Sequence, residues 1–221
     1  MHRPQAWFVT GTDTGVGKTF VCCALLQRAA REGRRALAMK PIAAGCDAQG
    51  RNEDVEQLIA AANVGAPRAD INPYCFAPAI APHIAAQQAG ERIEPRCILE
   101  AYARLKPLTE LLLVEGVGGF CVPLADGYDS AQLARDLGLP VILVVGLRLG
   151  CLNHALLSTE AIAARGLRLA GWVANRIDPE MVAWQENVAA LSERLPAPLL
   201  GTLPPRADTH RAAPLLRWPA D

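Results

Sequence analysis

Short apolar runs alternate along the chain with segments in which apolar residues recur every three or four positions. Several of the runs are apolar on both faces, as expected for strands that helices cover on both sides. The runs predict strands at Ala6–Thr10, Arg35–Lys40, Leu111–Glu115, Val141–Val145, Leu169–Asn175 and Leu199–Leu203. The periodic segments predict helices near Lys18–Glu32, Glu53–Asn63, Arg96–Leu105, Ser130–Leu137, Asn153–Ala164 and Pro179–Arg194. Because this alternation is typical of βαβ units, we expect an α/β fold, a mostly parallel sheet with helices on both faces.

The domain organisation follows from the length. With 221 residues, no internal repeat and no clear boundary, the chain predicts a single α/β domain over residues 1–221. The segment Ala66–Glu94 is rich in proline and alanine. We interpret it as a long excursion that carries substrate contacts, with a linker as the alternative.

Composition narrows the possible functions. The formal net charge is zero and 51 % of the residues are hydrophobic, so nothing indicates bulk attraction to nucleic acid or an anionic membrane. No uninterrupted apolar run of 18 residues predicts a membrane span, and Met1–Gln5 is too short and polar for a signal peptide. The seven cysteines form no C-x-x-C pair, and Cys22 and Cys23 lie in an apolar helical run. We therefore expect reduced core thiols in a cytoplasmic protein, and neither a disulfide nor a zinc framework.

The strongest chemical signal is a glycine-rich loop. The apolar strand that ends at Thr10 runs into Gly11-Thr12-Asp13-Thr14-Gly15-Val16-Gly17-Lys18-Thr19, and a helical pattern begins at once. This context is that of a P-loop, in which backbone N–H groups and a helix N-terminus bind phosphate. Lys18 would reach the β- and γ-phosphates and the Thr19 hydroxyl would ligate Mg²⁺. The loop is one residue longer than G-x-x-x-x-G-K-[ST], and a plain strand–helix turn is the alternative.

A second signal is the strand Leu111–Glu115, which ends in one acid followed by glycines. This pattern resembles a Walker B strand, which holds a carboxylate at the sheet edge where ligands bind. Glu115 could then coordinate Mg²⁺, and Gly116 and Gly118 would allow close approach of the backbone to a ligand. A solvated acid at the end of a strand is the alternative.

Two further polar segments flank this edge. Lys40 ends a strand before Pro41, where its charge could stabilise a phosphoryl group or a carboxylate; an ordinary edge lysine is the alternative. Asn52 precedes a helical pattern, with acids in its first turn, which favours an N-cap. The alternative makes Asp54 a second metal-binding carboxylate.

Together these motifs resemble the dethiobiotin synthetase family over nearly the whole chain. The matching elements are TGTDTGVGKT (Thr10–Thr19), KPIAAG (Lys40–Gly45), NPYCF (Asn72–Phe76), PH (Pro82–His83), LLVEGVGG (Leu112–Gly119), PVILVVGLRLGCLNHALL (Pro140–Leu157) and GWVAN (Gly171–Asn175). The resemblance implies a Rossmann-like P-loop NTPase fold and a homodimer with its substrate site at the subunit interface. The implied substrates are 7,8-diaminononanoate (diaminopelargonic acid), CO2 and ATP, with Mg²⁺ as cofactor. A carbamate of the diamine is phosphorylated by ATP, and the second amine closes the cyclic urea of dethiobiotin.

The resemblance also assigns roles to residues of this chain. Lys40 and Lys18 are catalytic, and Thr19, Asp54 and Glu115 hold the metal. The ATP-binding residues are Gly15, Val16, Gly17, Lys18, Thr19, Phe20, Asp54, Glu115, Gly116, Val117, Gly118, Asn175, Arg176, Pro204, Pro205 and Arg206, of which Asn175 reads adenine. The substrate-binding residues are Thr12, Lys40, Ala44, Gly150, Cys151 and Asn153, and the turn at Gly150 comes from the partner subunit. Plain packing is the alternative role for Cys151 and for His154.

Two departures from the family pattern and three rival functions remain. One rival, a non-enzymatic nucleotide-binding module, would bind ATP without turnover. A serine is often found at the position of Ala44, so its hydroxyl contact is absent or is supplied elsewhere, for instance by Thr12. Arg176 and Arg206 stand where the family is often not basic, which leaves strict preference for ATP open. A cobyrinate-type amide synthetase would need a glutaminase domain, and only 46 residues follow Asn175. A ParA/MinD-like ATPase switch would carry a lysine five residues before Lys18, where this chain has Asp13.

Overall fold

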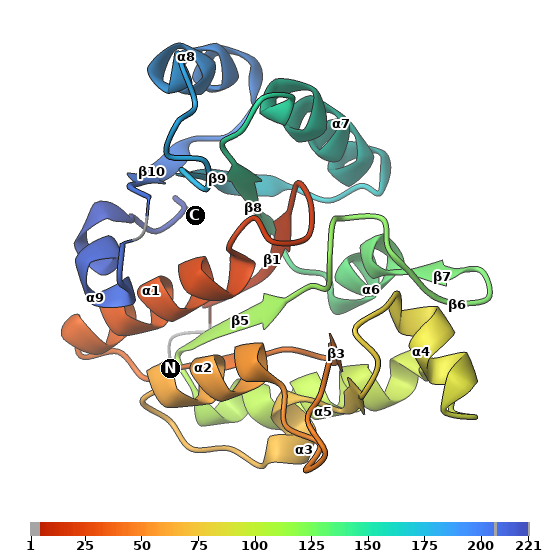
Figure 1. Ribbon diagram of the computed structural model, residues 1–221. Coiled ribbons are helices and arrows are strands. Elements are labelled where there is room, and N and C mark those ends of the chain that lie inside the picture. Colours follow the sequence, from red (N-terminus) through yellow and green to blue (C-terminus); the bar gives the residue numbers. More distant parts are fainter. Residues whose placement is uncertain (1–4, 206, 221) are drawn as a thin grey trace.

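The structure is a computed structural model that describes residues 5–205 and 207–220. Its centre is a parallel sheet of six strands in the order β10-β9-β8-β1-β5-β2 (Figure 1). The strands are β1 (Gln5–Gly11), β2 (Ala36–Met39), β5 (Leu111–Glu115), β8 (Val141–Gly146), β9 (Leu169–Asn175) and β10 (Leu199–Leu203). All of the predicted strands are confirmed, each end to within one residue. They are predictable because a strand that is buried on both faces is an unbroken apolar run.

The predicted helices are also present. They are α1 (Lys18–Arg31), α2 (Glu53–Ala61), α5 (Pro95–Leu105), α6 (Ser130–Leu137), α7 (Cys151–Ala164) and α8 (Trp184–Arg194). The prediction for α8 was wrong at its start, because residues 176–183 form turns in place of helix. Ala183, directly before the helix, has a φ of 56°, a left-handed conformation that a helix cannot continue through.

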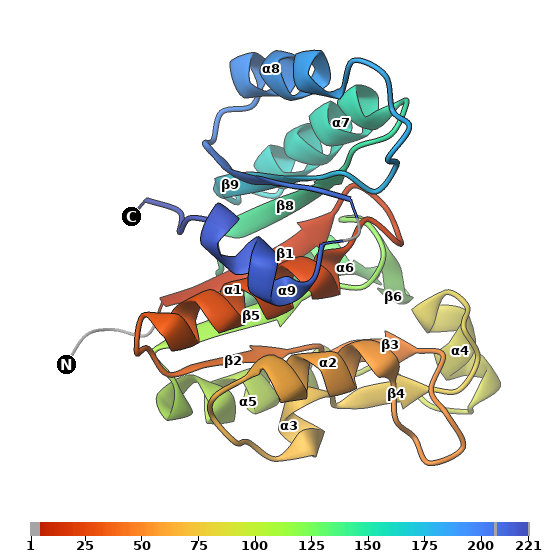
Figure 2. The ribbon, with the colours of Figure 1, turned by 60° about the vertical axis from the view of Figure 1, so that its left-hand side comes forward.

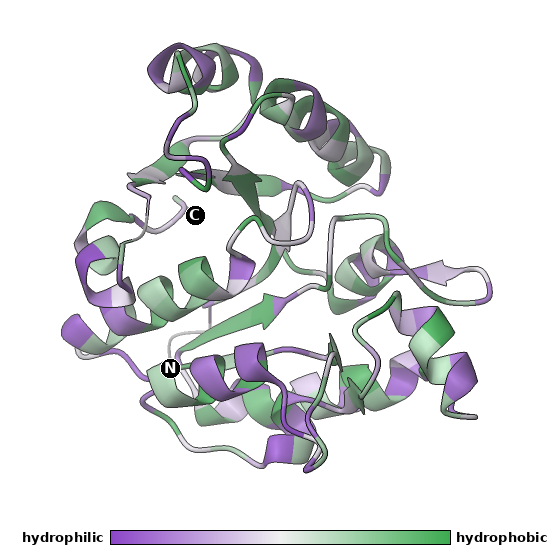
Figure 3. Cartoon of the chain, viewed as in Figure 1, coloured by the Kyte–Doolittle hydropathy of each residue, from purple (hydrophilic) through white to green (hydrophobic). Residues whose placement is uncertain are grey.

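Helices cover both faces of the sheet, as Figures 1 and 2 show. α1 and the short α9 (Thr209–Ala212) pack on one face, around the side chains of Trp7 and Val9. α5, α6 and α7 pack on the other face, around Phe8, and α8 lies against α7. Figure 3 shows the same division, with apolar strands inside and polar residues on the outer side of helices such as α2. No helix among the described residues is long and apolar enough to cross a membrane.

Two small sheets extend the carboxyl edge of the central sheet. β3 (Ile42–Ala44) pairs in parallel with β4 (Tyr74–Phe76), and β6 (Pro123–Ala125) pairs with β7 (Tyr128–Asp129). The predicted excursion at residues 66–94 contains β4, α3 (Arg68–Ile71) and α4 (Pro82–Gln88). It is therefore folded structure attached to β2 and β3, and the linker alternative is wrong.

The expectation that all cysteines are reduced was wrong at one place. Cys46, just after β3, forms a disulfide with Cys75 of β4, with 6.2 Å between their Cα atoms. The parallel pairing of β3 with β4 brings these residues together across a separation of 29 positions, which no local spacing reveals. Cys22 and Cys23 are buried free thiols of α1, as predicted, and burial raises the pKa of both.

Candidate active site

The loop between β1 and α1 has the strand–loop–helix context that the sequence predicts. Gly15 and Gly17 have φ values of 75° and 90°, where residues with a side chain are strained. Lys18 begins α1, and its Nζ donates a hydrogen bond to the carbonyl oxygen of Asp13 at 3.2 Å. The loop therefore closes around a lysine at a helix N-terminus, the arrangement that binds phosphate in P-loop proteins.

Gly17 is also a point of close approach. A Cβ atom at this position would lie 2.3 Å from Nδ2 of Asn175, at the end of β9. The same Nδ2 donates to the carbonyl oxygen of Val16 at 2.8 Å. Glycine at position 17 thus lets the end of β9 touch the loop, and Asn175 ties the two together.

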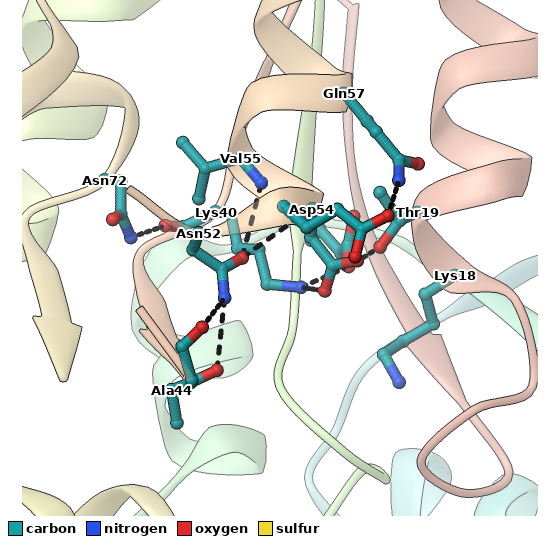
Figure 4. Close-up of polar contacts among 12 residues, drawn as sticks. Lys18, Thr19, Lys40, Ala44, Asn52, Asp54, Val55, Gln57 and Asn72 are labelled. Carbon is teal, nitrogen blue, oxygen red and sulfur yellow. Dashed lines mark hydrogen bonds and ion pairs between the residues drawn. The ribbon is translucent and has the colours of Figure 1, made fainter. Parts of the chain in front are cut away.

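Lys40, at the end of β2, is the centre of a buried ionic cluster (Figure 4). Its Nζ lies 2.8 Å from Oε1 of Glu115 and also donates to Oδ2 of Asp54. Lys40 is 5 % exposed and Glu115 is 1 % exposed, whereas the side chain of Asp54 is 44 % exposed. Each buried charge therefore has an opposite partner, which its desolvation requires.

The pKa values of Lys18 and Lys40 are shifted in opposite directions. Burial alone would lower the pKa of Lys40, but the carboxylates of Glu115 and Asp54 outweigh it and hold that pKa above its ordinary value. Burial lowers the pKa of Lys18, and Glu115 only partly offsets this. Burial would raise the pKa of Asp54, yet the charge and hydrogen bond of Lys40 hold it below its usual range. Lys40 is therefore a firmly protonated cation that contacts the side chains of Glu115 and Asp54.

Three oxygen donors of this cluster could hold a metal ion. The hydroxyl of Thr19 donates to Oε1 of Glu115 at 2.7 Å, and Asp54 lies on the other side of the Lys40 ammonium. Oε2 of Glu115 is buried and has no partner in the described part of the chain. A hydroxyl and two carboxylates match the hard-oxygen preference of Mg²⁺, which usually takes its remaining ligands from water and substrate phosphates. The donor set therefore fits the predicted metal.

The start of α2 places Asp54. Asn52 is its N-cap, as predicted, and its side chain accepts hydrogen bonds from the backbone N–H groups of Asp54 and Val55. This cap holds the first turn of α2 against the end of β2. The predicted N-cap is therefore confirmed and Asp54 pairs with Lys40, while the role of Asp54 as a second metal-binding carboxylate stays a prediction.

A cavity of about 810 Å³ opens over these residues. Its polar lining comes from the phosphate loop with Lys18, Thr19, Lys40, Asp54 and Glu115. Its lining also includes apolar residues and a glycine: Ala44, Ala79, Ile80, Pro82, Val117, Gly118 and Val122. The cavity therefore joins a phosphate-binding region to a surface suited to an aliphatic chain.

A second cavity, of about 340 Å³, shares Phe20 with the first as a lining residue. It gathers predicted ATP-binding residues from three segments: Phe20, Asn175, Arg176, Pro204 and Pro205. The guanidinium of Arg176 lies 4.2 Å from the ring centre of Trp184, a cation–π contact that holds this arginine at the rim. Arg206 was predicted here too, but it lies outside the described residues.

Comparison with known proteins shows which family the chain belongs to. A family model described as an AAA domain matches residues 5–213. The chain is 55 % identical to the ATP-dependent dethiobiotin synthetase BioD of Aromatoleum aromaticum, over 99 % of this chain and 100 % of the relative. It is 56 % identical to the protein of the same name from Nitrosospira multiformis, over 92 % of this chain and 90 % of the relative. The chain belongs to the dethiobiotin synthetase family.

Solved structures outside the family share the fold. MinD in the MinC:MinD complex of Aquifex aeolicus reaches a TM-score of 0.57 at 15 % identity, over 95 % of this chain and 86 % of that one. Chloroplast FtsY from Physcomitrella patens reaches 0.57 at 20 % identity, over 100 % of this chain and 63 % of that one. At such low identity these likenesses concern the architecture alone, and they agree with the predicted α/β P-loop fold.

Some residues that the dethiobiotin synthetase resemblance assigns to substrate lie apart from the main cavity in the single chain. Gly150, Cys151 and Asn153 form the N-terminus of α7 and are not among the described residues that line the cavity. The hydroxyl of Thr12 accepts a hydrogen bond from the N–H of Gly146 at 3.4 Å, whereas Ala44 does line the cavity. The structure of the single chain therefore brings together the predicted phosphate-binding and metal-binding residues, but not all of the predicted substrate-binding residues.

The structure also adds residues that the sequence did not indicate for this dethiobiotin synthetase site. Asn72 donates to the carbonyl oxygens of Lys40 and Tyr74, at 2.6 and 2.9 Å. Residues 79–82 also line the cavity; they belong to the excursion that was predicted to carry substrate contacts, although none of them was named as a site residue. Arg148, before α7, forms an ion pair with Asp13 of the phosphate loop. The NPYCF motif contains Asn72, but only the folded structure shows what its side chain contacts.

Proposed function

We propose that the chain is a single-domain, cytoplasmic, Mg²⁺- and ATP-dependent dethiobiotin synthetase, which forms the ureido ring of dethiobiotin from 7,8-diaminononanoate and CO2. The observation that carries this proposal is the meeting of Lys18, Lys40, Thr19, Asp54 and Glu115 at one cavity. This combination places two cations and a carboxylate pair where a nucleotide phosphate would lie. Family membership supplies the identity of the substrates.

The reaction needs cations more than it needs a nucleophile from the protein. One amine of the substrate reacts with CO2 to give a carbamate, and the γ-phosphoryl group of ATP is transferred to that carbamate. The second amine attacks the resulting carbamic–phosphoric anhydride, phosphate leaves, and the cyclic urea forms. Because the carbamate and the triphosphate are both anionic, their encounter is repulsive unless positive groups lie between them.

The residues of the cluster suit these steps. Lys18 would bind the β- and γ-phosphates, and Lys40, already protonated, would stabilise charge on the carbamate and the transferred phosphoryl group. Thr19, Asp54 and Glu115 would hold Mg²⁺, which would offset the charge of the phosphates. With the metal present, the Lys40 ammonium would no longer be the only cation between the carboxylates and could turn to the substrate. Asn175 would contact the base with its side-chain Oδ1 and with the second hydrogen of Nδ2, since one Nδ2 hydrogen bond goes to the carbonyl oxygen of Val16.

The apolar part of the cavity supports an aliphatic substrate, since Ala44, Ile80 and Val122 would contact methylene groups. A homodimer is part of the proposal, with the partner supplying the turn at Gly150. Two exposed leucines support it, because Leu149, just before α7, is 96 % exposed and Leu157, within α7, is 56 % exposed. Apolar side chains exposed in this way are typical of surfaces that another chain covers.

The deciding experiment is incubation with diaminononanoate, isotope-labelled bicarbonate and MgATP, followed by mass analysis. We expect dethiobiotin that carries the labelled carbon, together with ADP and phosphate in equal amounts. A MinD-like switch would hydrolyse ATP without the diamine and would form no urea. Labelled product therefore decides for the synthetase, and diamine-independent hydrolysis without product decides against it.

A further inference from the structure

A buried asparagine holds the backbone of Lys40 from the excursion side. Asn72 ends α3, and both hydrogens of its carboxamide are used: Nδ2 donates to the carbonyl oxygen of Lys40 at 2.6 Å and to that of Tyr74 at 2.9 Å (Figure 4). The backbone N–H of Lys40 donates to the carbonyl oxygen of Ile71 at 2.9 Å. Both backbone polar groups of Lys40 are therefore bound by the chain around α3.

A second buried asparagine holds the other end of the same segment. Nδ2 of Asn52 donates to the carbonyl oxygens of Ala44 and Gly45, at 3.1 and 3.4 Å. Its Oδ1 accepts from the backbone N–H groups of Asp54 and Val55, at 3.1 and 3.4 Å. One carboxamide thus connects the cavity wall at Ala44 to the helix turn that presents Asp54.

The segment 40–45 depends on these contacts because the central sheet no longer holds it. β2 ends at Met39, and Pro41 has no N–H group with which to continue the ladder to β5. β3 begins at Ile42 and pairs only with β4 of the excursion. Glu115, in contrast, lies within β5, which pairs with strands on both sides. The position of Lys40 relative to Glu115 is therefore determined from the excursion side.

We propose that Asn52 and Asn72 are positioning residues for ring closure, which fix the segment 40–45 so that the Lys40 ammonium and the Ala44 wall face the reacting groups. The inference rests on the proposed function, since it assigns the segment a task in that reaction. Neither asparagine touches the substrate; each acts through the backbone that it holds. A displacement of about 1 Å in such a segment is enough to lower a rate by about a hundredfold.

The substitution Asn→Asp separates positioning from simple structural support. Aspartate has almost the shape of asparagine, but it donates no hydrogen bond when ionised and at most one when protonated, whereas the asparagine donates two. Asn52→Asp keeps the acceptor that caps α2, and aspartate is as good an N-cap as asparagine, so only the donors to Ala44 and Gly45 are lost. Asn72→Asp likewise removes the donors to Lys40 and Tyr74. Asn52→Ser is a second variant that keeps a cap without a charge.

Asn63, an exposed residue that follows α2, is the control. Its carboxamide also bridges backbone groups, accepting from Ala36 N–H at 2.8 Å and donating to the carbonyl oxygen of Arg34 at 2.9 Å. These contacts lie at the opposite end of β2, away from the cavity. Asn63→Asp therefore makes the same chemical change and leaves the segment 40–45 untouched.

The test measures kcat and KM for the diamine, ATP affinity by calorimetry, and Tm for each variant. We expect kcat to fall about 10- to 100-fold in Asn52→Asp and Asn72→Asp, with ATP affinity within about threefold of wild type. Asn52→Ser should follow Asn52→Asp, and Asn63→Asp should keep the wild-type kcat. Unchanged kcat in the Asn52 and Asn72 variants would overturn the inference, as would losses of ATP affinity and Tm that match the loss of kcat. A wild-type protein that makes no dethiobiotin would instead refute the proposed function, a result that the variants cannot produce.

Discussion

Lys40 and Glu115 lie 75 positions apart in the sequence, yet Nζ of Lys40 is 2.8 Å from Oε1 of Glu115. The contact joins the ends of two neighbouring strands of the central sheet, β2 and β5. Both side chains are almost fully buried, and the cavity with the phosphate loop lies directly beside them. The proposed function gives Lys40 two separable tasks, to balance buried carboxylates in the free protein and to stabilise anionic reactants, and each task can be tested.

The catalytic task predicts that Lys40→Gln lowers kcat by about 10²- to 10³-fold, the usual loss when a donor to developing negative charge is removed. ATP affinity should stay within about threefold of wild type, because Lys18 and the loop bind the phosphates. Steady-state assay of dethiobiotin formation and calorimetry with a non-hydrolysable ATP analogue measure the two effects. Lys106→Gln changes a lysine that stacks on Tyr102 outside the cavity, and it should retain full activity. Wild-type turnover by Lys40→Gln would remove the catalytic assignment.

If Lys40 balances the buried carboxylates, its substitution should lower the free energy of unfolding more than the substitution of Asp54. Lys40→Met leaves Glu115 charged and buried, which should lower the free energy of unfolding by about 3–5 kcal/mol. Asp54→Asn should cost about 1 kcal/mol or less, because the Asp54 side chain is 44 % exposed and water screens its charge. Urea unfolding without nucleotide measures both. The double variant Lys40→Met/Glu115→Gln should lose less than the sum of its single variants, and strict additivity would show that the pair does not interact.

The proposed role of Lys18 in binding the terminal phosphates predicts a change in nucleotide affinity. Lys18→Ala should weaken ATP binding by about 10- to 100-fold, since a hydrogen bond to a charged group contributes about 1.5–3 kcal/mol. AMP, which lacks the β- and γ-phosphates, should bind wild type and variant alike. Calorimetric titration with each nucleotide measures this difference. An equal loss for AMP would mean that the substitution disturbs the loop as a whole and not the contact to the terminal phosphates.

The sequence predicts the part of this molecule that local patterns encode. Each strand of the central sheet is an apolar run, so β5 and β9 were predicted with the correct ends. The parallel order then brings the polar strand ends to one edge, which is why Lys40 and Glu115 were predicted to lie near the phosphate loop. Asn52 was predicted as an N-cap for the same local reason.

What the sequence does not show depends on contacts between distant segments. β3 and β4 are three residues long each, too short for a hydrophobic period, and they exist because they pair with each other. The Cys46–Cys75 disulfide and the contact of Asn72 with Lys40 both follow from that pairing. The late start of α8 follows from the left-handed Ala183, a residue type that gives no sign of such a conformation.

The disulfide should be a measurable source of stability. It closes a loop of 29 residues that includes α2 and α3, and a loop of this size contributes about 3–4 kcal/mol in the chain-entropy model. For a chain of this length, that corresponds to a fall in Tm of about 6–15 °C on reduction with a dithiol. Differential scanning calorimetry of the oxidised and reduced protein measures the shift.

Serine variants separate the disulfide from the other thiols. Cys46→Ser and Cys75→Ser should melt like the reduced wild type and should no longer respond to the dithiol. Cys97→Ser, which changes an exposed free cysteine, should still respond. Alkylation and mass analysis of the unreduced protein should leave Cys46 and Cys75 unlabelled. Labelling of both in that sample would contradict the disulfide.

The contact between the phosphate loop and β9 gives a prediction with an internal control. At Gly17 a Cβ atom would lie 2.3 Å from Nδ2 of Asn175, and φ is 90°; at Gly15 φ is 75° and nothing lies within 4 Å of the added atom. Gly15→Ala therefore adds backbone strain alone, about 1–2 kcal/mol. Gly17→Ala adds the same strain and a collision that must displace Asn175 from the carbonyl of Val16.

We therefore expect Gly17→Ala to lower both Tm and ATP affinity more than Gly15→Ala does. Removing the obstructing amide should reverse part of the effect, so Gly17→Ala/Asn175→Ala should unfold at a higher temperature than a sum of the two single effects implies. These effects are measured by thermal unfolding and ATP titration of the wild type and of four variants: Gly15→Ala, Gly17→Ala, Asn175→Ala and Gly17→Ala/Asn175→Ala. Equal losses for Gly15→Ala and Gly17→Ala would mean that strain alone matters, and that Asn175 does not hold the loop in place.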